Sequence, residues 1–306
     1  MELIRGIHNI KPYHRDCVLT IGNFDGVHQG HCRVLKNAKN EAKKLNLPLT
    51  VMVFEPQPQE LFSPANAPAR LYRLRDKYTH LSAMGVDRLL CVNFNHRFAA
   101  MTAENFIQNL IVNKLGVKFL IVGDDFRFGK GRGGDFNMLN QAGESLGFDV
   151  KSTTSYRLDD CRVSSTAIRT ALLNDQLDFA EAMLGRPYSI AGRVAHGDKK
   201  GRTIGFPTAN IHLKRCVSPV NGVYAVEVKL GNRCIKGVAN IGNRPTVAGI
   251  RQQLEVHLFN FNDDIYGCRL EVILRHKLRE EQKFESFNAL KEQIALDVLN
   301  AKHVLV

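Results

Sequence analysis

The stretch GNFDGVHQGH, residues Gly22–His31, decides how the first half of this chain folds. Before it, Cys17–Ile21 is a short apolar run with β-branched residues, which predicts a buried strand. After it, Cys32–Leu45 carries apolar residues at helical spacing. The stretch is therefore a glycine-rich turn from a strand into a helix. Free backbone N–H groups and the positive end of the helix dipole meet at such a turn, so we expect it to bind phosphate groups.

Two kinds of residue in this stretch suit a phosphate ligand. Gly22, Gly26 and Gly30 allow the backbone to turn sharply and to approach a ligand closely. His28 and His31 add imidazoles that can donate hydrogen bonds to phosphate oxygens. An HxGH tetrad by itself is also typical of an ordinary strand–turn–helix connection with surface histidines. Its place between a buried strand and a helix favours the phosphate site.

The composition is that of a globular protein with two domains. The chain has 306 residues, of which 44% are hydrophobic and 24% charged. We expect neither a membrane span nor a signal peptide, because apolar runs are short and charges interrupt residues 1–20. Seven scattered cysteines without a CxxC pair predict reduced thiols in the cytoplasm and no structural zinc. The net charge of +12 is spread along the chain, which favours phosphorylated small molecules over nucleic acid as partners.

Strands and helices alternate from Cys17 to about Val150. Further buried strands are predicted at Leu49–Phe54, Arg88–Val92 and Lys118–Val122, and helices at Asp76–Met84 and Ala103–Leu115. This alternation predicts an α/β domain with a parallel sheet covered on both faces. Ligands bind such sheets at the carboxyl ends of the strands. Three polar segments follow predicted strands there: Gly22–His31, Phe54–Pro58 and Gly123–Asp135.

The pattern changes near Leu184–Pro187. Short runs, many with β-branched residues, now alternate with turns: Tyr188–Val194, Gly222–Leu230, Cys234–Ile241, Gln252–Phe259 and Arg269–Leu274. They predict a compact antiparallel barrel or sandwich, of which we prefer the barrel. A terminal helix is predicted from about Ser286, with apolar core positions at Phe287, Leu290, Ile294, Val298 and Ala301. We place the domain boundary between residues 185 and 186.

The segment Gly123–Asp135, GDDFRFGKGRGGD, contains a formal GxGxxG pattern. Its glycines begin too far beyond the strand for a dinucleotide fingerprint, and a P-loop reading fails on spacing and lacks Ser or Thr. The segment still suits a polar, planar ligand, because Asp125 can accept and Arg127 can donate hydrogen bonds. Phe126 and Phe128 can stack on such a ligand. The alternative is a long surface loop.

The segment Arg162–Arg169, RVSSTAIR, opens a predicted helix. Hydroxyl groups at a helix start, here Ser165 and Thr166, are usually only caps. Arg169 follows one turn later, so it can face the same phosphate. With the HxGH histidines this segment would complete a clamp around a triphosphate.

In the second half, Gly201–Asn210 reads GRTIGFPTAN. Thr208 and Asn210 offer neutral oxygens, which together with nucleotide phosphates suit Mg²⁺, although the string alone is typical of a turn. Asn240–Thr246, NIGNRPT, predicts a polar loop. Glu255 lies within a predicted strand, where a carboxylate usually faces solvent. At a pocket it would be a candidate general base.

Taken in order, these motifs resemble the bacterial bifunctional riboflavin kinase/FMN adenylyltransferase family, also called FAD synthetases. The resemblance covers essentially the whole chain and rests on GNFDGVHQGH, FEPQP, VGDDFRFGK, SSTAIR, GRTIGFPTAN, NGVYA, NIGNRPT and EVHLFNF. HxGH alone occurs in many nucleotidyltransferases and class I aminoacyl-tRNA synthetases, but its combination with PTAN is specific to this family. The resemblance implies a Rossmann-like nucleotidyltransferase domain over residues 1–185 and a flavokinase barrel with a terminal helix over residues 186–306.

The resemblance also implies two reactions with ATP as co-substrate. The kinase moves the γ-phosphoryl group of ATP to the ribityl hydroxyl of riboflavin, with Glu255 as the base that takes the hydroxyl proton. Thr208 and Asn210 would hold Mg²⁺ and its nucleotide, and Gly201 and Gly205 would lie at the ATP phosphates. Asn260 departs from the family, which often has an acid there, so the charge of this pocket is open.

In the second implied reaction, the FMN phosphate attacks the α-phosphorus of another ATP, and pyrophosphate leaves. His28 and His31 would stabilise the charge that develops on the phosphates. The implied ATP-binding residues are Gly22, Asn23, Gly30, Ser165, Thr166 and Arg169, and the implied flavin-binding residues are Asp125, Phe126 and Arg127. The expected partners are riboflavin, FMN and ATP, with no nucleic acid and no membrane.

Two other functions compete with this interpretation. One is an adenylyltransferase with a single activity and an appended binding barrel, which the intact PTAN motif and Glu255 disfavour. The other is a nucleic-acid-binding or aminoacyl-tRNA synthetase-like protein. It would need a KMSKS-like loop, which the chain lacks, or a surface stripe of basic and aromatic residues.

Overall fold

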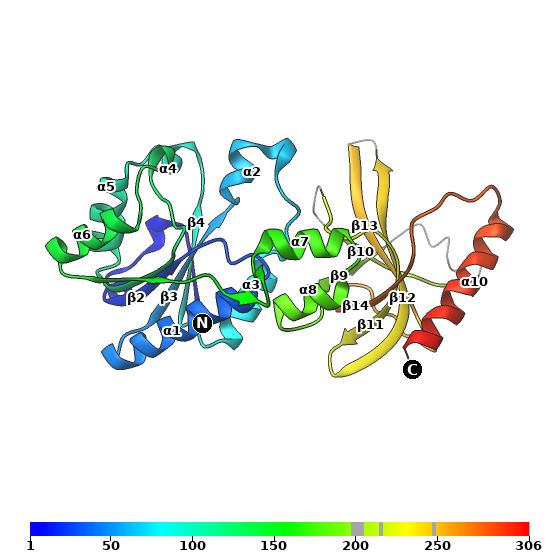
Figure 1. Ribbon diagram of the computed structural model, residues 1–306. Coiled ribbons are helices and arrows are strands. Elements are labelled where there is room, and N and C mark those ends of the chain that lie inside the picture. Colours follow the sequence, from blue (N-terminus) through cyan, green and yellow to red (C-terminus); the bar gives the residue numbers. More distant parts are fainter. Residues whose placement is uncertain (197–204, 214–216, 247–248, 306) are drawn as a thin grey trace. The chain divides into compact units, whose positions relative to one another are not determined.

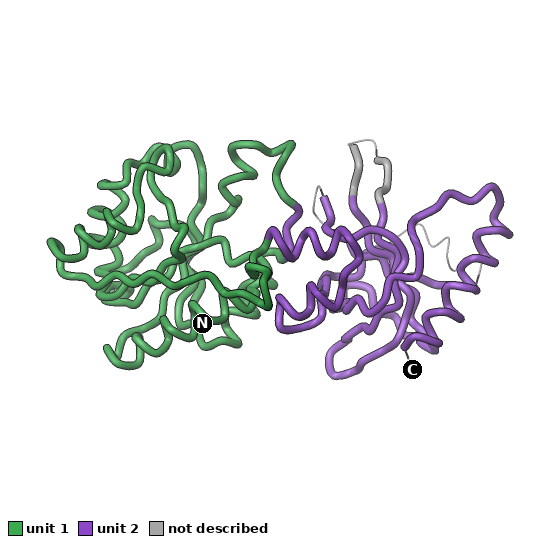
Figure 2. The backbone as a smooth tube through the Cα atoms, in the orientation of Figure 1, with its two compact units in different colours: residues 1–68, 72–165 green, residues 69–71, 166–306 purple. Residues whose placement is uncertain are grey.

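The computed structural model describes residues 1–196, 205–213, 217–246 and 249–305. The chain forms two compact units, one of residues 1–68 with 72–165 and one of residues 69–71 with 166–306 (Figure 2). Apart from its first residue, helix α7 (Ser165–Leu173) belongs to the second unit, as does α8 (Leu177–Leu184). The division of the two activities at residue 185 stays a prediction. Among the described residues, no helix is both long and apolar enough to cross a membrane.

The first unit is built on a parallel sheet of six strands in the order β1-β4-β3-β2-β5-β6 (Figure 1). The strands are β1 (Glu2–Arg5), β2 (Cys17–Ile21), β3 (Leu49–Glu55), β4 (Arg88–Asn93), β5 (Val117–Gly123) and β6 (Asp149–Thr153). All neighbouring pairs run parallel, which confirms the predicted α/β sheet. After β2 the chain builds one side of the sheet through β3 and β4, and later the other side through β5 and β6. The loop after β2 therefore opens where the strand order reverses, which is where such sheets bind ligands.

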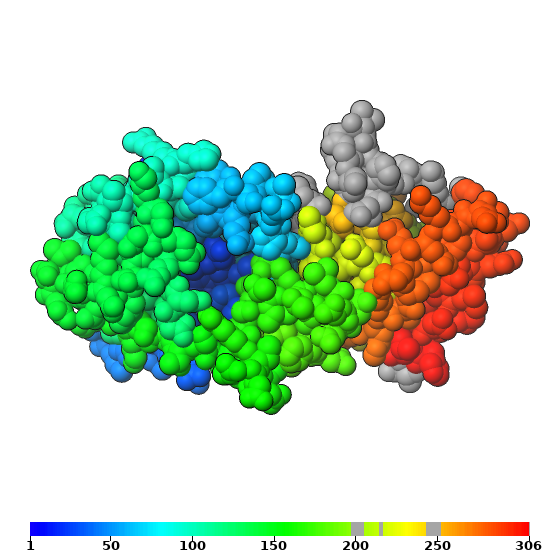
Figure 3. Space-filling model, turned by 45° about the horizontal axis from the view of Figure 1, so that its top comes forward, coloured from blue at the N-terminus to red at the C-terminus, as the bar shows by residue number. Residues whose placement is uncertain are grey.

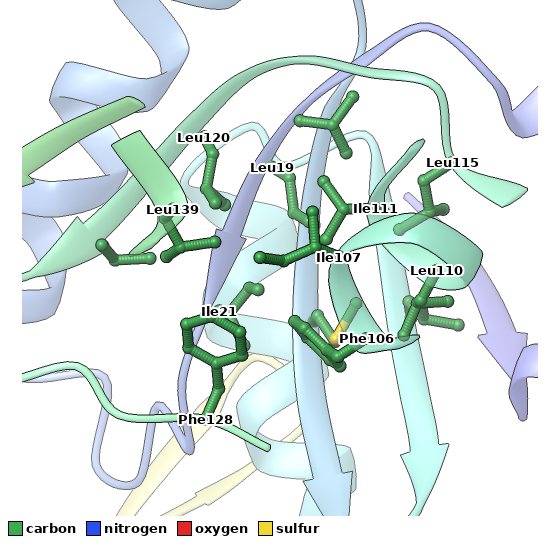
Figure 4. Close-up of a cluster of buried hydrophobic side chains, with 14 of the residues drawn as sticks. Leu19, Ile21, Phe106, Ile107, Leu110, Ile111, Leu115, Leu120, Phe128 and Leu139 are labelled. Atoms are coloured by element: carbon green, nitrogen blue, oxygen red, sulfur yellow. The ribbon is translucent and has the colours of Figure 1, made fainter. Parts of the chain in front are cut away.

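Helices cover both faces of this sheet. On one face, α1 (Gln29–Leu45) and α3 (Leu74–Ala83) pack around a buried cluster that includes Val18 of β2. On the other face, α6 (Phe136–Leu146) and the π-helical segment η4 (Phe106–Lys114) pack against Leu19 and Leu120 (Figure 4). The predicted helix 103–115 is thus α5 (Ala103–Asn105) continued by η4. The shorter elements are α2 (Pro58–Phe62), α4 (His96–Ala99), β7 (Arg157–Leu158), β8 (Cys161–Arg162), η1 (Ile7–Asn9), η2 (Pro12–His14), η3 (Pro64–Asn66) and η5 (Lys130–Arg132).

The second unit contains a closed antiparallel barrel with the strand order β10-β13-β12-β11-β14-β9. The strands are β9 (Ser189–Ala195), β10 (Ala209–His212), β11 (Gly222–Leu230), β12 (Arg233–Thr246), β13 (Gly249–Leu258) and β14 (Arg269–Arg279). Closure confirms the barrel and removes open strand edges. The predicted polar loop 240–246 is wrong, because these residues continue β12 and pair with β13. That pairing satisfies backbone groups that a loop would expose to water.

The terminal helix α10 (Phe287–Val304) covers the outside of the barrel, and Ser286 accepts a hydrogen bond from the backbone N–H of Ala289 at 3.1 Å as its N-cap. Ala301 packs against Val223 on β11. Asp297 is 3% exposed and accepts hydrogen bonds from the guanidinium of Arg279 through both oxygens. Phe287, predicted as a core residue, is exposed, because the buried contacts of α10 lie in its last turns. In Figure 3 the last part of the chain, orange to red, forms a continuous exposed surface of this unit.

Candidate active sites

The turn after β2 has a strained backbone. Phe24 and Val27 have φ angles of 47° and 41°, and Gly26 has a φ of 82°. Positive φ is an outlier for a β-branched residue and costs about 1–3 kcal/mol per residue. Phe24 and Val27 are both buried in the cluster beneath α1, and this packing holds the turn. Strain held in this way is typical of ligand sites.

His28 and His31 meet at the first turn of α1. His28 is the N-cap of the helix, and its Nδ1 accepts a hydrogen bond from the backbone N–H of His31 at 3.4 Å. The two rings are stacked, with centroids 3.6 Å apart. Because Nδ1 of His28 accepts, a neutral His28 ring carries its proton on Nε2. In this geometry Nε2 is the nitrogen of a neutral His28 ring that carries the donor proton.

The glycines of the turn sit against aromatic rings. A Cβ atom on Gly30 would lie 3.2 Å from two atoms of the His28 ring and 3.5 Å from the carbonyl oxygen of Val163. A Cβ atom on Gly22 would lie 3.3 Å from the ring of Phe24. A side chain at either position would therefore make the neighbouring ring move by a few tenths of an ångström.

Asp25, a residue to which the sequence analysis assigned no role, anchors the turn from inside. Its side chain is 1% exposed and accepts a hydrogen bond from the backbone N–H of Tyr72 at 2.9 Å. Its main-chain oxygen accepts a hydrogen bond from the Ser165 hydroxyl at 2.9 Å. Ser165, predicted to bind phosphate, thus lies beside the HxGH turn.

The other predicted phosphate-binding residues are placed as follows. Gly22 follows β2 directly, and Asn23 is exposed in the turn. Thr166 is exposed on α7, and Nε of Arg169 donates to the carbonyl oxygen of Ala69 at 2.5 Å within the second unit. A clamp of Thr166 and Arg169 with the histidines stays a prediction.

The loop after β5 carries ion pairs between charged side chains. Arg162 contacts Asp125 with an Nη2–Oδ2 distance of 2.7 Å, and Arg127 contacts Asp135 at 2.9 Å. The backbone N–H of Met138 and then the Arg127 guanidinium hold the pKa of Asp135 below its usual value. Asp125 and Arg127 are both exposed, so the predicted flavin-binding pair is accessible to a ligand.

Phe126 and Phe128 occupy different environments in this loop. Phe126 is half-buried, with its ring 5.7 Å from that of Phe128. Phe128 is 7% exposed and packs in the core against Phe106, at a centroid distance of 5.3 Å (Figure 4). A Cβ atom on Gly134 would lie 2.6 Å from the Phe128 ring, so the glycine makes room for it. Phe126 alone of the two keeps substantial exposed area for stacking.

An aromatic cluster that the sequence did not predict lies at the same edge of the sheet. Phe54 is the last residue but one of β3, and its ring centroid lies 5.6 Å from that of Phe94, which follows β4. Phe94 also contacts Phe98 and Phe62, each at 5.8 Å. Phe62 is 62% exposed. Apart from Phe54 in FEPQP, these residues lie in no motif, so only the fold brings them together.

Three polar residues form one row across the barrel, which we call the polar row: Asn210 on β10, Glu255 on β13 and Asn240 on β12. Glu255 is the cross-strand partner of both asparagines, and cross-strand partners share one face of a sheet. The row lies on the outer face, because Val223, the next partner of Asn240, packs under α10. Glu255 is half-buried rather than fully solvated.

Asn240 is a second residue that the sequence analysis missed. Its Oδ1 is buried and has no hydrogen-bond partner. An unsatisfied buried group costs about 1–3 kcal/mol, and a ligand group can supply the missing bond. The sequence placed Asn240 both at the end of a predicted run, 234–241, and at the start of a predicted loop, 240–246, and neither gives the strand pairing that puts it beside Glu255.

The predicted metal ligands Thr208 and Asn210 lie together at the start of β10. Nδ2 of Asn210 donates to the carbonyl oxygen of Thr208 at 3.4 Å, and Oδ1 of Asn210 accepts from Nε2 of Gln253 at 2.5 Å. Across the described ranges, no group of three or more His, Cys, Asp or Glu side chains could hold a metal. Neutral oxygens fit Mg²⁺ that is held mainly by phosphates and water. Gly205 is an exposed turn residue with a φ of 86°, and Gly201 lies outside the described residues.

A pocket of about 650 Å³ opens at the end of the barrel beside Thr208. Its lining is partly apolar, from Val256 and Phe261, and partly acidic, from Asp263 and Asp264. Tyr266 also lines it and stacks on His196, with ring centroids 4.0 Å apart. The pocket thus offers apolar and aromatic walls next to the candidate metal ligands.

These features define a class of protein that contains a parallel α/β unit, with a glycine-rich strand–helix turn, and an antiparallel barrel. The FAD synthetase family matches residues 10–167, and the riboflavin kinase family matches residues 184–305. The chain is 59% identical over 304 residues to the bifunctional riboflavin kinase/FMN adenylyltransferase of Escherichia coli K12, covering 99% of this chain and 97% of that protein. The Haemophilus influenzae protein of the same name is 54% identical, with 99% and 98% coverage.

A solved structure, described as a macrolide-efflux protein from Streptococcus pneumoniae, is 30% identical and has a TM-score of 0.80. The similarity covers 97% of both chains. The chain belongs to the bifunctional riboflavin kinase/FMN adenylyltransferase family, as both family matches and the full-length relatives show. The alternative of an adenylyltransferase with a single activity is therefore rejected.

Proposed function

We propose that the first unit adenylylates FMN at the HxGH turn and that the barrel phosphorylates riboflavin at the polar row. The observation that carries this assignment is the separation of two polar sites: stacked histidines at a helix start, and Glu255 between two asparagines. A division of the two activities at residues 1–185 and 186–306 is part of the proposal.

In the adenylylation, an oxygen of the FMN phosphate attacks the α-phosphorus of ATP, and pyrophosphate leaves. Imidazole N–H groups of His28 and His31 and the backbone N–H groups at the start of α1 stabilise the negative charge of the transition state. No general base is needed, because the attacking phosphate is already ionised at neutral pH. The residues proposed to bind ATP are Gly22, Asn23, Gly30, Ser165, Thr166 and Arg169.

Replacing Gly30 by alanine is expected to lower FAD formation, by less than the loss of about 10²-fold that is typical of a displacement of about 1 Å. The added methyl group would push on the His28 ring, which would lie 3.2 Å from the new Cβ atom. Helix stability should not fall, because alanine is favoured over glycine within a helix. Turnover of supplied FMN measures the effect, and the neighbouring Gln29→Ala variant is the control. Equal rates for Gly30→Ala and Gln29→Ala would contradict the tight contact.

The FMN substrate is proposed to bind at the loop after β5. Arg127 can donate to its phosphate, Asp125 can accept from its polar groups, and Phe126 can stack on the flavin ring. The aromatic cluster at this edge extends the apolar surface to the exposed ring of Phe62.

In the phosphorylation, Glu255 is proposed to take the proton of the ribityl hydroxyl as that oxygen attacks the γ-phosphorus of ATP, and ADP leaves. Asn240, with its unsatisfied Oδ1 one strand away, can accept a hydrogen bond from another hydroxyl of the substrate. Mg²⁺ is proposed to be held by Asn210 and Thr208, and when bound it neutralises charge on the nucleotide phosphates. The pocket beside Thr208 is proposed to take the adenine ring of ATP, because Tyr266 and Phe261 provide aromatic walls.

A fragment of residues 186–306 is expected to fold and to phosphorylate riboflavin, because all six barrel strands and α10 lie within it. A longer fragment of residues 166–306 is the control, since it keeps the 2.7 Å ion pair between Asp175 and Lys277. That pair is worth at most about 1 kcal/mol, but the shorter fragment also loses the buried side chains of Met183 and Leu184, so it should unfold earlier on heating than the longer one. A folded fragment 186–306 without kinase activity would contradict the division at residue 185.

The proposed setting is the cytoplasm, with riboflavin, FMN and ATP as partners and no nucleic acid. Scattered cysteines without a CxxC pair favour a reducing compartment. Steep loss of RNA binding with added salt would instead support a nucleic-acid partner.

One experiment tests the whole proposal. The purified protein is incubated with riboflavin, ATP and Mg²⁺, and the flavins are separated by chromatography over time. FMN should form first and FAD should follow, and omission of Mg²⁺ should stop the first step. Absence of FMN with an intact fold would overturn the assignment of the barrel.

A further inference from the structure

Gln253 lies next to the polar row but has no role so far. It is on β13, two residues before Glu255, so both side chains lie on the same face of the strand. Its side chain is 7% exposed, and that of Asn210 is 8% exposed. Nε2 of Gln253 donates to Oδ1 of Asn210 at 2.5 Å, and Nδ2 of Asn210 donates to the carbonyl oxygen of Thr208 at 3.4 Å.

These two hydrogen bonds determine how the Asn210 amide is turned. A primary amide can present either its oxygen or its NH₂ group to a given side, and the two choices differ by a rotation of half a turn. Gln253 donates to Oδ1 of Asn210, and the Thr208 carbonyl accepts from Nδ2. Each end of the Asn210 amide therefore faces a group with which it can form a hydrogen bond. With Gln253 unchanged, the reverse orientation would place the NH₂ group of Asn210 against the NH₂ group of Gln253. It would also place the amide oxygen of Asn210 against the carbonyl oxygen of Thr208.

The orientation matters because only the oxygen of an amide binds a cation. Oδ1 has two lone pairs, and Gln253 uses one of them. The second lone pair is then available to Mg²⁺ without any rotation of the side chain. Groups behind a metal ligand commonly orient it in this way, and their replacement weakens metal binding by about 10–100-fold.

We propose that Gln253 is a positioning residue of the kinase site, which holds the Asn210 amide with its oxygen directed to Mg²⁺. The inference rests on the proposed function of the barrel, because it takes Asn210 as a metal ligand. Gln253 is not itself proposed to contact the metal or the substrate.

The test uses the full chain with two substitutions at this position. Gln253→Met keeps the length of the side chain but cannot donate, and Gln253→Glu places a carboxylate against Oδ1 and favours the wrong orientation. Calorimetric titration of MgCl₂ into the protein with ADP measures metal binding without turnover. The Mg²⁺ concentration for half-maximal riboflavin phosphorylation is measured in parallel. Gln282→Met, in the exposed segment before α10, is the matched control.

Both Gln253 variants should bind Mg²⁺ about 10–100-fold more weakly, with the larger loss for Gln253→Glu. Phosphorylation at saturating Mg²⁺ should fall much less, which also reports an intact barrel, and supplied FMN should still become FAD at the normal rate. Unchanged metal binding in both variants would overturn the inference, and so would a fall in kcat with an unchanged requirement for Mg²⁺. Failure of the unmodified protein to phosphorylate riboflavin would instead overturn the proposed function.

Discussion

Replacing His31 by alanine is expected to abolish FAD formation and to leave FMN formation nearly intact. The His31 ring stacks on His28 at the start of α1, where the phosphates of ATP are proposed to lie. Loss of one preorganised donor to a developing negative charge costs about 10²–10³-fold in rate. The barrel residues proposed for phosphorylation lie in the other compact unit, so that reaction should continue. The measurement is kcat for each reaction on the same purified variant.

The control for this variant is His96→Ala, at an exposed position at the start of α4. It removes an imidazole from the same unit but away from the HxGH turn. If His31→Ala lost both activities while the protein stayed folded, the division of labour between the two units would be wrong.

Replacing Glu255 by glutamine is expected to lower riboflavin phosphorylation by about 10²–10⁴-fold, the usual contribution of a positioned general base. Glutamine keeps the shape of the side chain, and most of its hydrogen bonds, but cannot take the ribityl proton. The apparent affinity for riboflavin should therefore change much less than turnover. Supplied FMN should still become FAD, because its attacking phosphate needs no base.

The control for Glu255→Gln is Glu292→Gln, which makes the same change at an exposed position on α10. The competing explanation is that Glu255 is an ordinary solvated strand residue. In that case both glutamine variants would turn over riboflavin at the normal rate, and unchanged kinase turnover in Glu255→Gln would reject the base.

The central strand of the first unit could be predicted to the residue. Cys17–Ile21 is fully buried because it lies in the middle of a parallel sheet, and such strands are continuous apolar runs. The edge strands β1 and β6 were not predicted, because they are short and partly exposed, with a weak apolar pattern. Burial on both faces gives a central strand a clear apolar pattern. Partial exposure weakens the apolar pattern of an edge strand.

Strand β10 of the barrel is likewise not predictable from its local sequence. The string GFPTAN is typical of a turn, and nothing in it predicts a strand at Ala209. Its pairing with β9 and β13 makes these residues a strand, and both partners lie far away along the chain. Likewise, residues 240–246 look like a polar loop until β13 supplies their hydrogen bonds.

The sequence by itself determined the chemistry that each motif can offer: histidines in HxGH, neutral oxygens in PTAN and a strand carboxylate at Glu255. Their order along the chain also pointed to the family, because local strings need no fold to be recognised. Only the tertiary structure decided which of them share a surface. Glu255 lies between Asn210 and Asn240, and Gln253 holds Asn210, because strand register aligns residues that are distant along the chain. Such register depends on pairing across the whole barrel, which no single stretch of sequence contains.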